Sequence, residues 1–91
     1  MNRSEILKKA NEYITKDRQS THGDAEDSFA NIANLWGAYL DKTIGVKDAA
    51  IMMTLLKIAR YKKNPYNIDN AIDMAGYSAI AGELGVLNEL S

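Results

Sequence analysis

Residues 47–77, KDAAIMMTLLKIARYKKNPYNIDNAIDMAGY, give the clearest indication of the fold of this chain. The first half of this stretch is apolar on most sides and ends before Pro65, which cannot continue a helix. Its second half begins after Asn67, a residue suited to capping a helix N-terminus. Because a short link makes consecutive helices antiparallel neighbours, we predict a helical hairpin. Its members are a central, largely enclosed helix over residues 47–62 and a second helix over residues 68–84.

Two further helices are predicted before this hairpin. Residues 3–15 and residues 25–41 each repeat apolar side chains at the 3.6-residue period, and the polar segment 16–24 between them reads as a loop. No strand pattern occurs in residues 1–91, so the predicted fold is all-α, a compact, four-helix bundle-like single domain. A domain of this size buries only roughly 60 to 65% of the surface that its unfolded chain exposes. We therefore expect a homo-oligomer.

The composition narrows the classes of partner. Eleven basic and twelve acidic side chains give a formal net charge of -1, and no run of Lys or Arg provides the field that holds a nucleic-acid polymer. The absence of cysteine excludes a disulfide framework and a thiolate metal site. The N-terminus lacks a signal-peptide pattern, and no apolar run reaches the roughly 20 residues that span a membrane. We expect a soluble, cytoplasmic protein with no membrane, DNA or RNA partner.

Charged and polar side chains follow helical spacing along both helices of the predicted hairpin. Lys57 and Arg60 lie three residues apart and share a face of the first helix, where the guanidinium offers a planar fork to a phosphate or carboxylate. A matching ladder on one edge of the second helix consists of Asp69, Asn70, Asp73 and Tyr77. Two interpretations stay open: salt bridges between the helices, or a site for a small anionic ligand.

A second polar cluster precedes the helix at residues 25–41. His22, the only histidine of the chain, sits with Asp24 in a Gly-containing turn at a helix N-terminus, where free N–H groups favour an anion. Alternatively, Asp24 is only the helix cap and His22 is a solvated loop residue. The turn contributes to a site if the fold brings it beside Lys57 and Arg60.

Metal chemistry is a separate possibility. Asp69 and Asp73, four residues apart, could share one Mg²⁺ whose remaining ligands are water. Two carboxylates are few for a catalytic metal centre, and a lone histidine without cysteine argues against zinc. Because no nucleophile-elbow, Walker or dinucleotide-binding glycine pattern is present, no catalytic residue is assigned.

One ordered set of motifs resembles a known family. It runs from His22-Gly23-Asp24 through Phe29 and Leu35-Trp36 to Leu56-Lys57-Ile58-Ala59-Arg60, and then to Asp69-Asn70-x-x-Asp73-x-x-Gly76-Tyr77. Across about residues 5–84 this order looks like a family of small all-α proteins from phages and prophages, to which no biochemical activity is attached. The resemblance implies expression in a bacterial host cytoplasm.

A central helix followed by an Asp-bearing helix is also distantly similar to the all-α nucleotide pyrophosphohydrolases of the MazG type. Those enzymes place Glu-x-x-Glu on one helix and Glu-x-x-Asp on another to hold Mg²⁺ against a nucleoside triphosphate. Here the first motif is absent, and Asp69 and Asp73 are four residues apart. The positions expected to face them are Lys57 and Arg60. This departure removes metal ligands and supplies cations, which favours nucleotide binding over hydrolysis.

Three functions follow, and the favoured one is a binding module that sequesters a nucleotide-derived signalling molecule, as small anti-defence proteins of phages do. The expected ligand-binding residues are His22, Asp24, Lys57, Arg60, Asn70, Asp73 and Tyr77. The first alternative is a MazG-like pyrophosphohydrolase with Mg²⁺ at Asp69 and Asp73. Asp24 or Glu26 would complete its metal shell, and no cofactor is expected outside this alternative. The second alternative is a structural or interaction protein without a small-molecule ligand.

Overall fold

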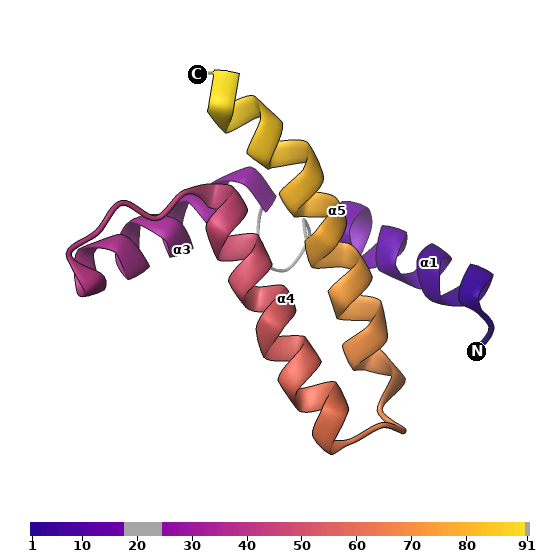
Figure 1. Ribbon diagram of the computed structural model, residues 1–91. Helices are drawn as coiled ribbons and strands as arrows, with labels where there is room; N and C mark the ends of the chain where they lie inside the picture. The colour runs from indigo at the N-terminus through magenta and orange to yellow at the C-terminus, as the bar shows by residue number, and fades with distance from the viewer. Residues whose placement is uncertain (18–24, 91) are drawn as a thin grey trace.

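The computed structural model describes residues 1–17 and 25–90. Within these ranges the chain forms helices and no strand (Figure 1), which confirms the predicted all-α class. The elements are α1 (Arg3–Glu12), the π-helical segment η1 (Tyr13–Asp17), α3 (Ala25–Leu40), α4 (Val46–Lys63) and α5 (Ile68–Leu90).

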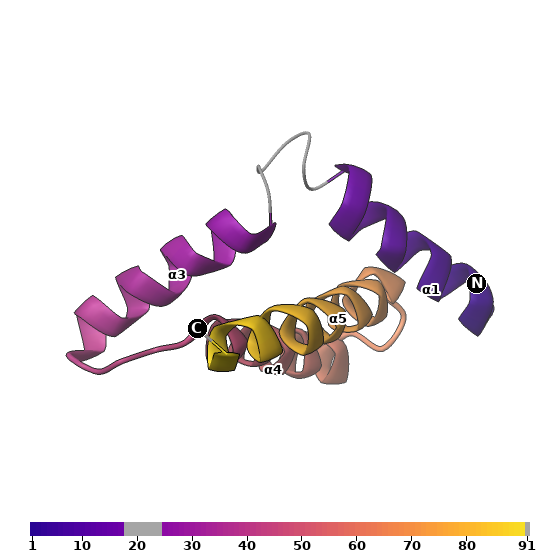
Figure 2. The ribbon, with the colours of Figure 1, turned by 90° about the horizontal axis from the view of Figure 1, so that it is seen from above.

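The helices form two layers: the α4–α5 hairpin is one layer, and α1 and α3 make up the other. α4 and α5 run antiparallel side by side, while α1 packs against α5 and α3 packs against α4. Seen from above, α1 and α3 lie on the same side of the hairpin (Figure 2). The opposite side of the hairpin therefore carries no further helix among the described residues.

The core lies where α3, α4 and α5 meet. Phe29 of α3 is its largest fully buried side chain, with 0% of its surface exposed. The Phe29 ring meets the Tyr77 ring of α5 edge-on, with centroids 5.8 Å apart and an interplanar angle of 75°. The other buried members are Ala33, Val46, Ala49, Ala50, Ile80, Ala81 and Leu84. Phe29 thus anchors the contact of α3 with the hairpin.

Local capping explains where several helices begin. The Asn2 side chain accepts a hydrogen bond from the Glu5 N–H at 2.9 Å, and the Glu5 carboxylate accepts one from the Asn2 N–H at 3.2 Å. At the start of α5, the Asn67 side chain accepts from the Asp69 N–H at 3.2 Å. The first residues of α1 and α5 are therefore determined by capping residues next to them in the sequence.

Two helix ends differ from those expected. α1 is regular only to Glu12 and continues as the π-helical segment η1 to Asp17, past the predicted end near residue 15. α5 continues to Leu90, past the predicted end at residue 84 and through Gly85, although glycine is common just after a helix C-terminus. A contact between helices explains why position 85 is a glycine: a Cβ there would lie 2.8 Å from Lys47 Cδ of α4. This glycine permits a close helix contact.

The end of α3 also depends on a glycine. The Lys42 N–H donates to the Gly37 carbonyl at 3.0 Å, and Asp41 adopts a left-handed conformation with φ of 56°. A Cβ on Gly37 would lie 2.7 Å from the Lys42 carbonyl oxygen. Gly37 therefore lets the chain fold back tightly before α4.

The prediction that α4 is largely enclosed is wrong. Its buried residues are confined to Val46, Ala49 and Ala50 near the N-terminal end. Its exposed large apolar side chains are Ile51, Met52, Leu55, Leu56 and Ile58. The physical reason is that α3 and α5 cover α4 on two sides only (Figures 1 and 2). Among the described residues, no helix combines the length and the apolarity that a membrane crossing requires.

Two glycines of α5 should respond oppositely to alanine. A Cβ on Gly82 would meet nothing within 4 Å, so Gly82→Ala should raise the free energy of unfolding by about 1 kcal/mol through helix propensity. A Cβ on Gly76 would lie 2.9 Å from Ile14 Cγ2, and overpacking of this kind costs about 1 to 3 kcal/mol. Gly76→Ala should therefore lower the stability. Urea denaturation of both variants checks this, and equal stabilisation of the two would contradict the close contact of η1 with α5.

Candidate functional site

A pocket of about 740 Å³ lies at the end of the α4–α5 hairpin. It is bounded by the last turns of α4, the link and the first turns of α5. Its lining residues are Lys57, Arg60, Lys63, Asn64, Asn67, Asp69, Asn70 and Asp73. This volume lies within the range of roughly 300 to 1,000 Å³ that is typical of small-molecule sites.

One ion pair crosses the pocket between the two helices. Lys57 Nζ lies 2.8 Å from Asp73 Oδ2, and the two side chains are 15% and 28% exposed. The partly buried position shields the pair from solvent more than a surface pair would be. For Lys57 and Asp73, the structure therefore supports the interpretation as a salt bridge between the helices.

Arg60 and Lys63 differ from Lys57. Both are exposed cations that line the pocket, and neither forms an ion pair with a described residue. Together with Lys57, they make three cationic side chains in the pocket lining, against two anionic ones. Because Asp73 is already paired, the remaining balance at the pocket is positive and suits an anion.

The helix ends themselves add little to this balance. The C-terminal end of α4 and the N-terminal end of α5 meet at the pocket, since the two helices are antiparallel. A helix N-terminus carries about half a positive elementary charge and a C-terminus about half a negative one, so the two effects oppose each other. Side-chain charge therefore decides the sign of the field in the pocket.

Asn70 is the buried polar residue of the site. It lines the pocket and is only 5% exposed. Its backbone N–H donates to the Asn67 carbonyl at 3.2 Å, whereas its side-chain carboxamide has no hydrogen bond in residues 1–17 and 25–90. Buried polar groups are normally paired, and leaving one unpaired costs about 1 to 3 kcal/mol. The carboxamide is thus a donor and acceptor available to a ligand.

Three of the predicted ligand-binding residues are not placed in this pocket. His22 and Asp24 lie outside the described residues. Tyr77 is described, but it borders another cavity, of about 40 Å³, between α5 and the α1–η1 segment, and its ring packs on Phe29. The reason is that Tyr77 lies one helical turn beyond Asp73, further from the link that closes the pocket.

The metal-binding alternative rests on Asp69 and Asp73, which both line the pocket. The Lys57 ammonium group already occupies the position beside Asp73 Oδ2. Within the part of the chain that the structure describes, no three side chains of His, Cys, Asp or Glu gather in a group able to hold a metal ion. Glu26, proposed to complete the shell, does not line the pocket.

Three of the lining residues were not among those predicted for the site. They are Lys63, Asn64 and Asn67. Lys63 lies just after the first predicted helix of the hairpin, and Asn67 was predicted only as the cap of the second, although a short antiparallel link brings both ends of a hairpin together. Combining these positions with the predicted hairpin would have extended the candidate site to the link.

Residues 5–85 match the family model described as "Domain of unknown function (DUF6378)". The chain is 43% identical to the Gene 55 protein of Mycobacterium phage L5 over 76 residues, covering 82% of this chain and 49% of the relative. It is 41% identical to the Gene 55 protein of Mycobacterium phage D29 over 73 residues, covering 80% and 48%.

The chain thus spans about half the length of the curated relatives it matches. No solved structure matches it. The similarity to MazG-type enzymes is not among these matches. Because the family model covers most of the sequence, this chain belongs to the DUF6378 family, a domain of unknown function that relates it to phage proteins.

Proposed function

We propose that this protein binds a small nucleotide-derived anion at the end of the α4–α5 hairpin and sequesters it without turnover. One observation carries the proposal: two cations that lack an ion-pair partner in the described chain, Arg60 and Lys63, border the same pocket as the buried, unpaired carboxamide of Asn70. Cations attract phosphate groups, and an arginine fork can bind two phosphate oxygens at once. A carboxamide both donates and accepts hydrogen bonds.

The combination of two cations with a buried carboxamide favours a nucleotide over a simple anion as the ligand. Inorganic phosphate would satisfy Arg60 and Lys63 but would leave the Asn70 carboxamide without a reason to be buried and unpaired. A nucleotide presents a phosphate at one end and the donor and acceptor groups of a base or ribose at the other. The pocket of about 740 Å³ can hold a ligand of this size.

The charged side chains of the pocket favour sequestration of the ligand over its hydrolysis. A Mg²⁺ ion at Asp69 and Asp73 would lie close to the Lys57 ammonium group, which is 2.8 Å from Asp73 Oδ2 and would repel a second cation. The pocket retains cations that stabilise a bound phosphate, and it offers two carboxylates to a metal. The phage relatives are compatible with capture of a host signalling nucleotide in the bacterial cytoplasm, that is, with an anti-defence role.

Isothermal titration calorimetry against a ligand panel tests the proposal. The panel contains cyclic dinucleotides, ADP-ribose derivatives, nucleoside triphosphates and inorganic phosphate, each with and without Mg²⁺. We expect at least one nucleotide to bind more tightly than phosphate, and chromatography to recover it unchanged. Cleavage of a triphosphate only with Mg²⁺ would overturn sequestration, and a panel without any heat would overturn ligand binding.

Asn70→Leu separates a ligand-binding role of the carboxamide from a structural one. Leucine is similar in shape and removes a buried unpaired polar group, so the free energy of unfolding of the ligand-free protein should rise by about 1 to 3 kcal/mol. The same variant should lose the thermal shift caused by the nucleotide. Asn31→Leu, at an exposed position of α3, is the matched control and should keep that shift. A destabilised Asn70→Leu protein would show that the carboxamide supports the fold instead.

A further inference from the structure

The outward face of α4 has an apolar surface that the fold does not cover. Leu55 is 57% exposed although it belongs to the apolar stretch of residues 49–56, which only Thr54 interrupts. α1 and α3 lie on the other side of the α4–α5 hairpin (Figure 2). Contiguous exposed apolar surface on a small protein marks an interaction site.

The spacing of this surface identifies the kind of partner. Its central line, here called the α4 seam, consists of Asp48, Met52, Leu55, Ala59 and Lys62. Successive members are separated by four, three, four and three residues, which is the spacing that packs one helix along another. All five members are exposed. The seam extends about 21 Å along α4, and the exposed side chains of Ile51 and Ile58 widen it on one side.

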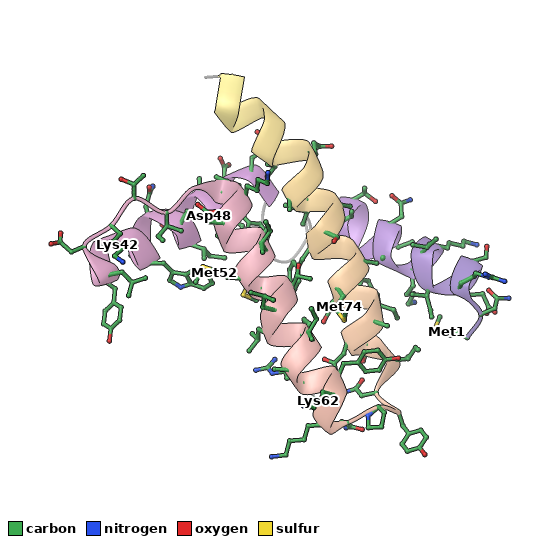
Figure 3. All side chains as sticks on the ribbon, viewed as in Figure 1. Met1, Lys42, Asp48, Met52, Lys62 and Met74 are labelled. Atoms are coloured by element: carbon green, nitrogen blue, oxygen red, sulfur yellow. The ribbon has the colours of Figure 1, made fainter. Side chains whose placement is uncertain are left out.

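The charges of the seam are arranged with opposite signs at its two ends. Asp48 lies near the N-terminal end of α4 and Lys62 near the C-terminal end, with Met52 between them (Figure 3). Leu55 is midway between Asp48 and Lys62 in the sequence. A copy of the same helix placed antiparallel would therefore set Asp48 against Lys62 at both ends and Leu55 against Leu55 at the centre.

We propose that the α4 seam binds a second copy of this chain, antiparallel, about a two-fold axis at Leu55. A parallel arrangement would instead bring Asp48 against Asp48 and Lys62 against Lys62, and like charges repel. Antiparallel packing also sets the two helix dipoles in opposition, which is favourable. Two-fold pairing through one self-complementary patch is the commonest form of protein oligomer.

The groups at the ends of the seam are able to make this contact. Asp48 Oδ2 accepts a hydrogen bond from the Gly45 N–H at 3.0 Å, which leaves the second carboxylate oxygen for a cation. Lys62 is exposed and forms no ion pair with the described part of the chain. Lys57 follows Leu55 by two residues and Arg60 follows it by five, so both of these pocket residues lie away from the line of Leu55 around α4. The proposal is thus independent of ligand binding.

Sedimentation equilibrium of the full chain tests the dimer. The wild type should approach twice the 10.1 kDa mass of one chain as its concentration rises. Leu55→Asp places two like charges at the axis and should sediment as a monomer with unchanged helical circular dichroism. Leu35→Asp, at a position 61% exposed on α3, is the matched control and should remain dimeric. A monomeric wild type, or a dimeric Leu55→Asp protein, would overturn the proposal.

Disulfide crosslinking tests the orientation independently of that variant. Because the chain has no cysteine, an introduced residue is its only thiol. In the antiparallel dimer, a mixture of Met52→Cys and Ala59→Cys chains should oxidise to a crosslinked pair carrying one of each. Met52→Cys alone should crosslink poorly, since its thiols would be about one helical turn or more from each other. Efficient crosslinking of Met52→Cys with itself, and none in the mixture, would contradict the antiparallel arrangement.

Discussion

Arg60→Met should weaken binding of the nucleotide by roughly 10- to 150-fold. A hydrogen bond to a charged group contributes about 1.5 to 3 kcal/mol, and each 1.4 kcal/mol corresponds to a tenfold change in the dissociation constant. Arg60 lines the pocket, is exposed, and has no ion-pair partner among the described residues. Its removal therefore takes away a ligand contact without leaving a buried carboxylate unpaired. Calorimetry with the best-binding nucleotide of the panel measures the change.

The control for Arg60→Met is Arg3→Met. Arg3 is exposed on α1 and does not line the pocket, so the variant makes the same chemical and net-charge change elsewhere. Arg3→Met should bind as the wild type does. Both variants should unfold at the same urea concentration as the wild type, because exposed substitutions usually change stability by less than about 0.5 kcal/mol. Equal weakening by the two variants would point to net charge instead of a contact in the pocket.

Phe29→Ala should lower the free energy of unfolding by about 3 to 5 kcal/mol. Truncating a fully buried aromatic ring removes its transfer free energy and leaves a cavity. Phe29 is 0% exposed and holds the Tyr77 ring edge-on at 5.8 Å, so that aromatic contact is lost as well. Since a domain of this size is stabilised by only about 5 to 15 kcal/mol, the variant should be close to unfolding at room temperature. Urea denaturation followed by circular dichroism measures the loss.

Leu35→Ala on the same helix provides the comparison for Phe29→Ala. Leu35 is 61% exposed, so its truncation should change the free energy of unfolding little. If both variants lose the same stability, α3 does not pack on the hairpin through the face that carries Phe29. If neither does, the cluster between α3, α4 and α5 is not the core of the molecule.

Helix type and order could be read from the sequence because their causes are local. The 3.6-residue apolar period and the capping residues Asn2 and Asn67 act within a few positions of the chain. The end of α5 could not be read in the same way. Glycine is typical just after a helix C-terminus, so Gly85 suggests that the helix ends there. Only the close approach of Lys47 on α4 reveals that helix packing requires a glycine at this position.

The candidate site was predictable in part for the same reason. Spacing alone placed Lys57 and Arg60 on one helix and Asp69, Asn70 and Asp73 on the next, and the short link made the two helices face each other. All five residues line the pocket. Spacing did not distinguish Tyr77 from them, because a helical period assigns a face and does not say how far along the helix a pocket extends.

An all-α chain with a polar ladder on each helix of a hairpin can be predicted from the sequence alone, since both properties depend on periods of a few residues. Only the tertiary structure decided that Lys57 pairs with Asp73 while Arg60 stays without an ion-pair partner in the described chain. It also decided that Asn70 is buried and that the outward face of α4 is open. The physical reason is that pairing and burial depend on the relative rotation of packed helices, which segments distant in sequence set together.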